Sequence, residues 1–172
     1  MEPDGLTEMK VHRLVFDPQT NSPIVILQDE GSGALLPIWI GIFEAHSIAM
    51  KMEGVETSRP LTHDLLSNTF TTINGMVERI EVVDLVDNTY FARIYFQLSD
   101  KSYSLDSRPS DAIALALRTA SPIFVANHVL ERSKIDPADL EEGQGEEGET
   151  EDEEWTRILR NYDPEGGKDK LN

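Results

Sequence analysis

Two segments of the chain show the same order of predicted elements, namely three strands followed by one helix. Apolar alternation and turn residues predict the first set over residues 11–16, 23–28, 34–40 and 42–52. The second set is predicted over residues 77–86, 90–98, 102–105 and 109–118. One common offset places Ile24 on Phe91 and Glu44 on Asp111. An internal duplication is the simplest explanation of this repeated order.

The remaining predicted elements complete a single α+β domain. A helix is expected between the two halves, over residues 61–73, and a strand and a short helix follow the second half over residues 122–125 and 127–134. The fold class is therefore α+β, with duplicated β-β-β-α units, a mostly antiparallel sheet and helices packed on it. The predicted boundaries are an N-terminal extension at 1–8, the domain at 9–140 with halves at about 9–56 and 77–120, and a tail at 141–172.

The tail differs from the domain in composition. Residues 141–150 are acidic and rich in glycine, which predicts a solvated linker. Apolar side chains then recur at helical spacing and predict one amphipathic helix, at Trp155, Ile158, Leu159 and Tyr162. We expect this helix to dock on its own domain, on a second subunit or on another protein. A homo-oligomer is the expected assembly.

Charge restricts how such a chain could meet a nucleic acid. The 172 residues contain 15 basic and 32 acidic side chains, which gives a formal net charge of -17. A field of this sign repels phosphate backbones and attracts cations. Any nucleic-acid substrate must therefore bind at a local arginine cluster or through a metal ion rather than on a basic surface. Adaptation to high salt is an alternative explanation of the acidity.

Composition also removes several classes of protein. The chain has no cysteine, so disulfides, thiolate metal sites and cysteine nucleophiles are excluded. Its N-terminal residues have no secretory pattern, and no apolar run approaches the ~20 residues that cross a bilayer. We therefore expect a cytoplasmic protein without a membrane partner. The common nucleotide, zinc-protease, serine-hydrolase and EF-hand motifs are not found in the sequence.

The tripeptide Ser-Arg-Pro occurs twice, as SRPLTHD at residues 58–64 and as SRPSD at residues 107–111. Proline suits the first turn of a helix, and an aspartate there complements the helix dipole. Arg59 and Arg108 are not explained by helix initiation. Each is fixed by its proline at a corner, where a guanidinium can grip a carboxylate or a phosphate with two hydrogen bonds.

Acidic residues at matching corners could meet these arginines and hold a metal ion. The candidate metal ligands are Glu44, Asp64, Asp106 and Asp111. The candidate catalytic set adds Arg59, His63 and Arg108 to them. With Asp64, His63 could bind a metal or carry a proton, although adjacent residues diverge by about 100° on a helix and a solvent-exposed histidine is the alternative. The structural interpretation of the whole set is a network of buried ion pairs that joins the half-domains. Trp39 is assigned to the core, with base stacking as the alternative.

Three motifs resemble the bifunctional nuclease (BFN domain) family. They are residues 36–41 (LPIWIG) with Glu44, Ala45 and Ile48, residues 59–66 (RPLTHDLL), and residues 106–116 (DSRPSDAIALA). The resemblance covers roughly residues 9–135. It implies a compact α and β fold with an internal duplication, and an activity like that of the plant members, which are credited with cutting both DNA and RNA. Some members of the family end in a UVR-type helical segment, and here an acidic tail takes that place. His46 and Ser47 stand where the family pattern has small apolar residues.

Three functions follow from these residues. The first is a metal-assisted phosphodiesterase of low sequence specificity acting on DNA or RNA, with Mg²⁺ or Mn²⁺ held by the four carboxylates and phosphate clamped by the two arginines. In that case His63 protonates the leaving oxygen or completes the metal shell. The second is a non-catalytic module that binds an anion, a nucleotide or a protein. The third is a purely structural role for the charged corner in the fold and a homodimer.

Overall fold

Seven strands form one sheet in the computed structural model, which describes residues 5–17 and 20–135. The order across the sheet is β3-β2-β1-β7-β4-β5-β6. All neighbouring pairs are antiparallel except β4 and β7, which are parallel. The strands are β1 (Leu6–Phe16), β2 (Pro23–Gln28), β3 (Leu35–Trp39), β4 (Gly75–Val86), β5 (Thr89–Leu98), β6 (Lys101–Ser107) and β7 (Ile123–Ala126).

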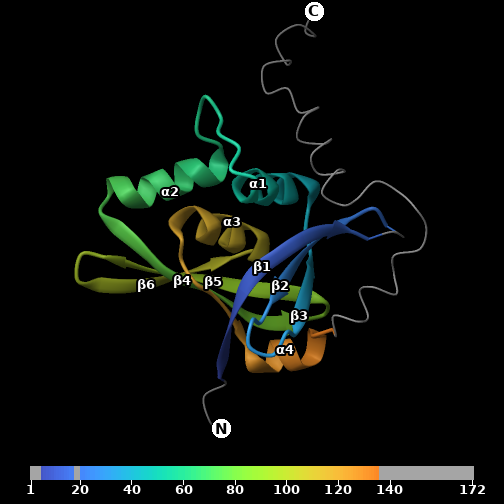
Figure 1. The fold of residues 1–172 in the computed structure, drawn as a ribbon. Helices are drawn as coiled ribbons and strands as arrows, with labels where there is room; N and C mark the ends of the chain where they lie inside the picture. Colours follow the sequence, from blue (N-terminus) through green and yellow to red (C-terminus); the bar gives the residue numbers. More distant parts are fainter. Residues whose placement is uncertain (1–4, 18–19, 136–172) are drawn as a thin grey trace, which may run out of the picture.

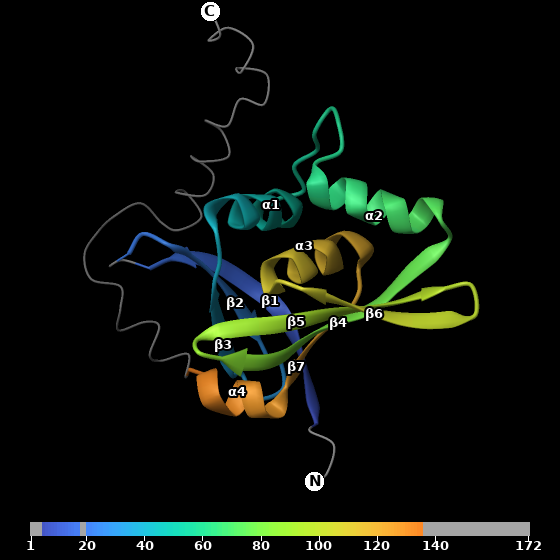
Figure 2. The same cartoon turned by 180° about the vertical axis from the view of Figure 1, so that it is seen from behind.

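The described helices pack against the curled sheet from two sides. α1, α2 and α3 lie above it in the view of Figure 1, and α4 lies below it, with Val129 and Leu130 in the same buried cluster (Figures 1 and 2). Packing of α1 and α2 against α3 makes α3 the centre of the helical layer. The helices are α1 (Ile42–Met52), α2 (Thr62–Thr72), α3 (Pro109–Thr119) and α4 (Asn127–Ser133).

The sheet curls enough to bring distant strands together. The Tyr90 hydroxyl at the start of β5 donates a hydrogen bond to the Pro37 carbonyl of β3 at 3.2 Å, although β2, β1, β7 and β4 separate these strands in the sheet order. Each edge strand also leads directly into a helix, β3 into α1 and β6 into α3. The curl therefore places the first turns of α1 and α3 at one corner of the molecule.

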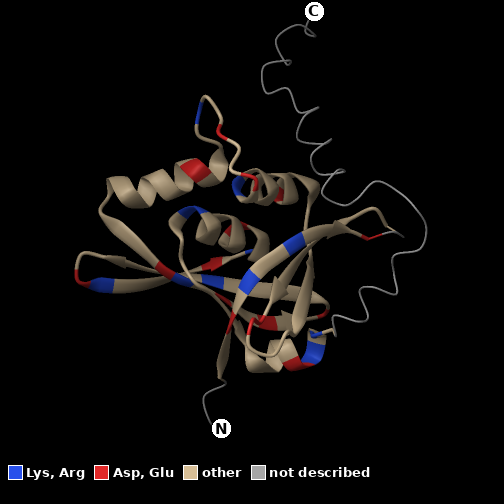
Figure 3. Cartoon of the chain, in the orientation of Figure 1, with Lys and Arg blue, Asp and Glu red and all other residues tan. Residues whose placement is uncertain are grey.

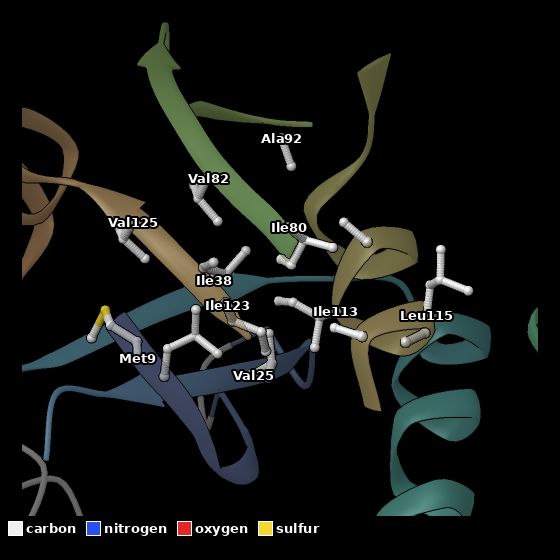
Figure 4. Close-up of a cluster of buried hydrophobic side chains, with 14 of the residues drawn as sticks. Met9, Val25, Ile38, Ile80, Val82, Ala92, Ile113, Leu115, Ile123 and Val125 are labelled. Carbon is white, nitrogen blue, oxygen red and sulfur yellow. The ribbon is translucent and has the colours of Figure 1, made fainter. Parts of the chain in front are cut away.

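The main core lies against the sheet and α1, α2 and α3, and it also includes Val129 and Leu130 of α4. Figure 4 shows side chains of β1, β2, β3, β4, β5 and β7 converging with Ile113 and Leu115 of α3. Ile113 and Leu115 are fully buried, as are Ile80 and Val82 of β4. A smaller cluster lies on the opposite face of β1 to β3 and contains Val15, Ile24, Ile26 and Leu35, with Ile135 packed against it. Pro109, Ser110 and residues 112–116 of α3 are buried, and this burial fixes the start of the helix relative to the sheet.

The α+β class and the mostly antiparallel sheet are confirmed, and so are all four helices within one or two residues. The strands predicted over residues 77–86 and 90–98 pair as a hairpin: Asp87 and Asn88 between them both have positive φ, the conformation of a tight turn. β1 begins at Leu6, earlier than the predicted residue 11, because residues 6–9 pair with β7. The repeated order of elements is present, while its origin by duplication stays a prediction. The tail at 141–172 lies outside the described residues.

The assignment of Trp39 to the core is wrong. Trp39 pairs with Ile24 on the face of the smaller cluster, whereas its neighbour Ile38 points into the main core. Because side chains alternate along a strand, an apolar strand of this type can still present its last residue to solvent. The Trp39 side chain is 54% exposed.

Charged positions are mixed over the described surface. Figure 3 shows basic and acidic residues interspersed on strands and helices rather than gathered on one element. No helix within residues 5–17 and 20–135 is long and apolar enough to cross a membrane.

Candidate functional site

Arg108 joins the first turns of the two helices that follow the edge strands. Its Nε and Nη2 donate to the two carboxylate oxygens of Asp111 at 2.7 and 3.0 Å. Its Nη1 forms an ion pair with Glu44 Oε1 at 2.8 Å. One guanidinium thus bridges a carboxylate from each half of the chain. The Arg108 side chain nevertheless stays 64% exposed, so the bridge faces solvent.

The local sequence explains this geometry. Arg108 is the N-cap residue of α3, with extended backbone angles that the following proline favours. Pro109 then occupies the first helical position, where its missing N–H is not needed. At the other helix, a Cβ at Gly41 would collide with the Glu44 carboxylate, so the glycine leaves room for that carboxylate to lie back over the helix start. The sequence therefore shapes both helix starts around the Arg108 bridge.

The bridge changes the titration of its members. Burial would raise the pKa of Asp111, but hydrogen bonds from Arg108 and His63 outweigh it and hold the pKa of this carboxyl below its ordinary value. In return, the carboxylates of Asp111 and then Glu44 raise the pKa of the Arg108 guanidinium. Asp111 and Arg108 are therefore both ionised at neutral pH.

His63 lies between Ser47 and Asp111 rather than beside Asp64. Its Nδ1 is 2.8 Å from Ser47 Oγ, and its Nε2 is 3.0 Å from Asp111 Oδ1. The His63 side chain is only 12% exposed, so the solvent-exposed alternative is wrong. Both ring nitrogens are engaged, which leaves His63 suited to orienting Asp111.

The Ser47, His63 and Asp111 side chains follow the order of a serine-hydrolase triad. Such a triad needs a serine oxygen that a substrate can approach. Ser47 is 8% exposed and lies in the middle of α1. Asp111 is shared with Arg108 as well. The arrangement therefore serves as a hydrogen-bonded support for the Arg108 bridge rather than as a nucleophile.

Asp64 belongs to a different cluster, around Arg118 of α3. The Arg118 Nε donates to Asp64 Oδ1, and its Nη groups donate to the Ala114 and Ser47 carbonyls at 2.9 and 3.1 Å. The Arg118 side chain is only 5% exposed. Asp64 Oδ2 also accepts from the Leu61 N–H at the start of α2. Burial would raise the pKa of Asp64, but the Arg118 and Leu61 bonds lower it. The structure thus places Asp64 in a buried tie between α1, α2 and α3.

Arg59 and Asp106 lie apart from the Arg108 bridge. Arg59 is exposed and lines a separate pocket of about 340 Å³, together with Lys51 and Asp64. Asp106 pairs with Arg93 across β5 and β6, whereas its neighbour Ser107 pairs with the buried Ala92. Alternation therefore directs Asp106 to the face of the sheet opposite α3. The seven candidate residues accordingly divide between the bridge, the Arg118 cluster and two outlying positions.

An open pocket of about 450 Å³ lies beside the Arg108 bridge. Arg108, Pro109 and Ser110 line one side of it, and Gly41 lines it at the start of α1. The first backbone N–H groups of a helix have no partner within the helix and carry positive partial charge. The start of α3 and the exposed Arg108 therefore favour an anion in this pocket, whereas the Glu44 carboxylate already lies over the start of α1.

The four predicted carboxylates do not form one metal site. No group of three or more His, Asp or Glu side chains placed to hold a metal ion occurs in the described part of the chain. Asp64 is held by Arg118, and Asp106 is directed to the other face. Only Glu44 and Asp111 lie close to a common cation, which is Arg108. Mg²⁺ is often bound by one or two carboxylates, with water and substrate phosphate as the other ligands. Of the four predicted ligands, only Glu44 and Asp111 fit that pattern.

Two residues of this region, Arg118 and Ser47, were not among the sequence candidates. Arg118 carried a detectable signal, since it is the one charged residue after Asp111 in the apolar helix of residues 109–119 and lies seven positions later on the same face. Ser47 stood out only as a departure from the family pattern. Its partner His63 is on another helix, and the sequence gives no measure of how two helices pack.

Comparisons with known proteins agree with the resemblance in the sequence. The model of the bifunctional nuclease domain matches residues 25–138. An uncharacterised protein of Mycobacterium tuberculosis is 34% identical over 164 residues, which cover 94% of this chain and 98% of that protein. Bifunctional nuclease 2 of Arabidopsis thaliana is 32% identical over 112 residues, or 63% of this chain, and bifunctional nuclease 1 of Oryza sativa subsp. indica is 25% identical over 116 residues, or 66% of it. The matched regions span 34% and 35% of those plant proteins.

Proposed function

The chain belongs to the bifunctional nuclease domain family, and from this premise we propose that it is a phosphodiesterase that cuts DNA or RNA at the Arg108 bridge. The observation that carries the proposal is an exposed arginine that is held by two carboxylates and lines an open pocket at the start of α3. No element of the described surface offers a basic stripe to a nucleic acid (Figure 3). Binding is therefore local, and low sequence specificity is expected because phosphate contacts carry no base information.

Arg108 is the proposed phosphate ligand. A guanidinium has five N–H donors, and Arg108 uses three on Asp111 and Glu44. The remaining donors and the backbone N–H groups at the start of α3 would bind the non-bridging phosphate oxygens. Because Arg108 is fixed on both sides, it needs little reorganisation when charge develops on those oxygens, which is the condition for transition-state stabilisation.

Glu44 is the proposed general base. Its Oε1 is bonded to Arg108, while its Oε2 lies over Gly41, a residue of the pocket wall. In the proposed step, Glu44 takes a proton from a water molecule as the water oxygen attacks phosphorus. The bond from phosphorus to the leaving oxygen breaks, and solvent returns a proton to that oxygen. His63 and Asp111 hold Arg108 in position and do not themselves transfer the proton.

A divalent metal ion is proposed as the charge partner of this site. Glu44, Asp111 and Arg108 together carry a formal charge of about -1, which is unfavourable for a phosphate. Glu44 and Asp111 would hold Mg²⁺ or Mn²⁺, and the ion would neutralise this charge and make water easier to deprotonate. Asp64 and Asp106 have no part in this proposal because the structure directs them elsewhere.

The alternative function is a module that binds an anion or a nucleotide without cutting it. One observation favours it: each carboxylate at the corner is already bonded to Arg108, as a structural ion-pair network would be. The two functions differ in turnover. They share the binding pocket.

The test is hydrolysis of single-stranded DNA and RNA by purified protein that has been treated with a chelator and then given Mg²⁺ or Mn²⁺. Cleavage is expected with one of these ions and is expected to disappear in Asp111→Asn, which should remain folded at the assay temperature. Asp106→Asn is the matched control and should retain the wild-type rate. Binding of the strands without cleavage in any condition would refute the phosphodiesterase and leave the binding module.

A further inference from the structure

An exposed tryptophan shares the pocket with Arg108. Trp39 ends the edge strand β3, and its side chain lines the same 450 Å³ pocket as Arg108, Tyr90 and Asn88. The indole is 54% exposed, which is unusual for the largest apolar side chain at the end of a buried strand. About half of the residue is therefore accessible to a partner from solvent.

The ring is held in place although it is exposed. The Trp39 Nε1 donates to Asp17 Oδ2 at 3.1 Å, and backbone pairing with Ile24 anchors the residue in the sheet. Tyr90, another residue that lines the pocket, is fixed too, because its hydroxyl donates to the Pro37 carbonyl two residues before Trp39. A fixed aromatic platform loses little entropy when it binds a ligand.

We propose that Trp39 is a base-stacking platform, which makes single-stranded nucleic acid the substrate that this pocket selects. The proposal rests on the proposed function, since it assigns the neighbouring phosphate to Arg108. A flat aromatic base on Trp39 and a phosphate on Arg108 account for both chemical features of the pocket. Stacking on an aromatic residue tolerates every base, because each base has a π-face. The subsite therefore adds affinity without sequence specificity.

The preference for a single strand follows from the geometry of a duplex. Bases in a duplex are already stacked on their neighbours, and one base can reach an external platform only after it is unstacked. The volume of the pocket lies within the range of small-ligand sites, so it can hold a nucleotide but no helix. A duplex should bind and react poorly, except at frayed ends.

Binding of a strand that resists hydrolysis tests the subsite separately from catalysis. The probe is a short single-stranded oligothymidylate with phosphorothioate linkages, and its partner probe is an abasic strand of the same length with the same linkages. Trp39→Leu keeps apolar bulk but removes the ring. It should weaken binding of the oligothymidylate roughly 5- to 150-fold, the range measured for one stacked base. Binding of the abasic strand should change less than twofold (about 0.4 kcal/mol).

Phe43→Leu is the matched control. Phe43 is an aromatic residue four positions later, it is 84% exposed, and it is not among the residues that line this pocket. Its replacement should leave both affinities unchanged. The chain has two tryptophans, so Trp155→Phe makes Trp39 the only tryptophan. The fluorescence of that variant should be quenched by the oligothymidylate and not by the abasic strand.

The outcomes separate this proposal from the phosphodiesterase. Three results would overturn the stacking platform, whether or not the protein cleaves nucleic acid. They are an equal loss of affinity for both probes in Trp39→Leu, no measurable binding by the wild type, and fluorescence that responds to neither strand. A base-dependent loss in a protein that never cleaves would keep the platform and refute the proposed catalysis. Equal cleavage rates for duplex and single strand would overturn the substrate preference.

Discussion

Replacing Asp64 with asparagine should destabilise the protein, because it leaves the Arg118 charge buried without its counter-ion. The Arg118 side chain is 5% exposed and Asp64 is 33% exposed. Breaking a buried ion pair from one side costs about 3–5 kcal/mol. The asparagine oxygen can still accept one bond, and Asp64 is partly solvated, so we expect the lower end, about 3 kcal/mol. At 2–4 °C for each kcal/mol, the melting temperature should fall by roughly 6–12 °C.

The assay is thermal unfolding followed by circular dichroism at neutral pH, with Asp106→Asn as the control. Asp106 is exposed on the edge strand β6, so its replacement should change stability by less than about 0.5 kcal/mol. Melting of Asp64→Asn at the wild-type temperature would refute the interpretation of Asp64 as a structural tie. It would also return Asp64 to the list of candidate metal ligands.

Three further perturbations test the Arg108 bridge and the pairing of Asp64 with Arg118. The folded-state pKa values of Asp64 and Asp111 are lowered, so these carboxylates stabilise the fold at pH values above their unfolded pKa. The free energy of unfolding, measured by denaturant titration, should therefore decline as pH falls from about 5 to 2. The same decline in a variant with both residues replaced by asparagine would contradict this. Gly41→Ala forces the Glu44 carboxylate away, and cleavage should slow on the order of tenfold with an unchanged melting temperature; a wild-type rate would argue against Glu44 as the base. His63→Gln should lower kcat on the order of tenfold without removing a limb of the pH-rate profile, whereas loss of a limb would show that His63 transfers a proton.

The corner could be predicted from sequence because it depends on local signals. Proline after Arg108 and an acid in the first turn fix one helix start. The common offset that aligns Glu44 with Asp111 places both acids at the starts of helices that follow strands. The curl of the sheet then brings these two starts together, and the structure joins both acids to Arg108.

The rest of the site depends on packing that local signals do not contain. Asp64 and Arg118 meet because α2 packs on α3, and the two residues are far apart in the sequence. Asp106 was grouped with Asp111 as an acid at a matching corner, but the register of β5 and β6 directs it to the other face. Trp39 ends an apolar strand of a type that usually lies in a core. The smaller apolar cluster on its face of the sheet does not extend over it, so the residue stays exposed.

Cleavage of single-stranded DNA or RNA by two arginine variants tests most directly whether phosphate is bound at the Arg108 bridge. Arg59 and Arg108 occur in the same tripeptide and are both exposed, but they line different pockets. Arg108→Gln should lower kcat/KM at least about 100-fold, the usual loss when one transition-state donor is removed. Arg59→Gln should stay within about twofold of the wild type, which is within the effect of an ordinary surface change. Equal losses in the two variants, or full activity of Arg108→Gln, would contradict a phosphate site at Arg108.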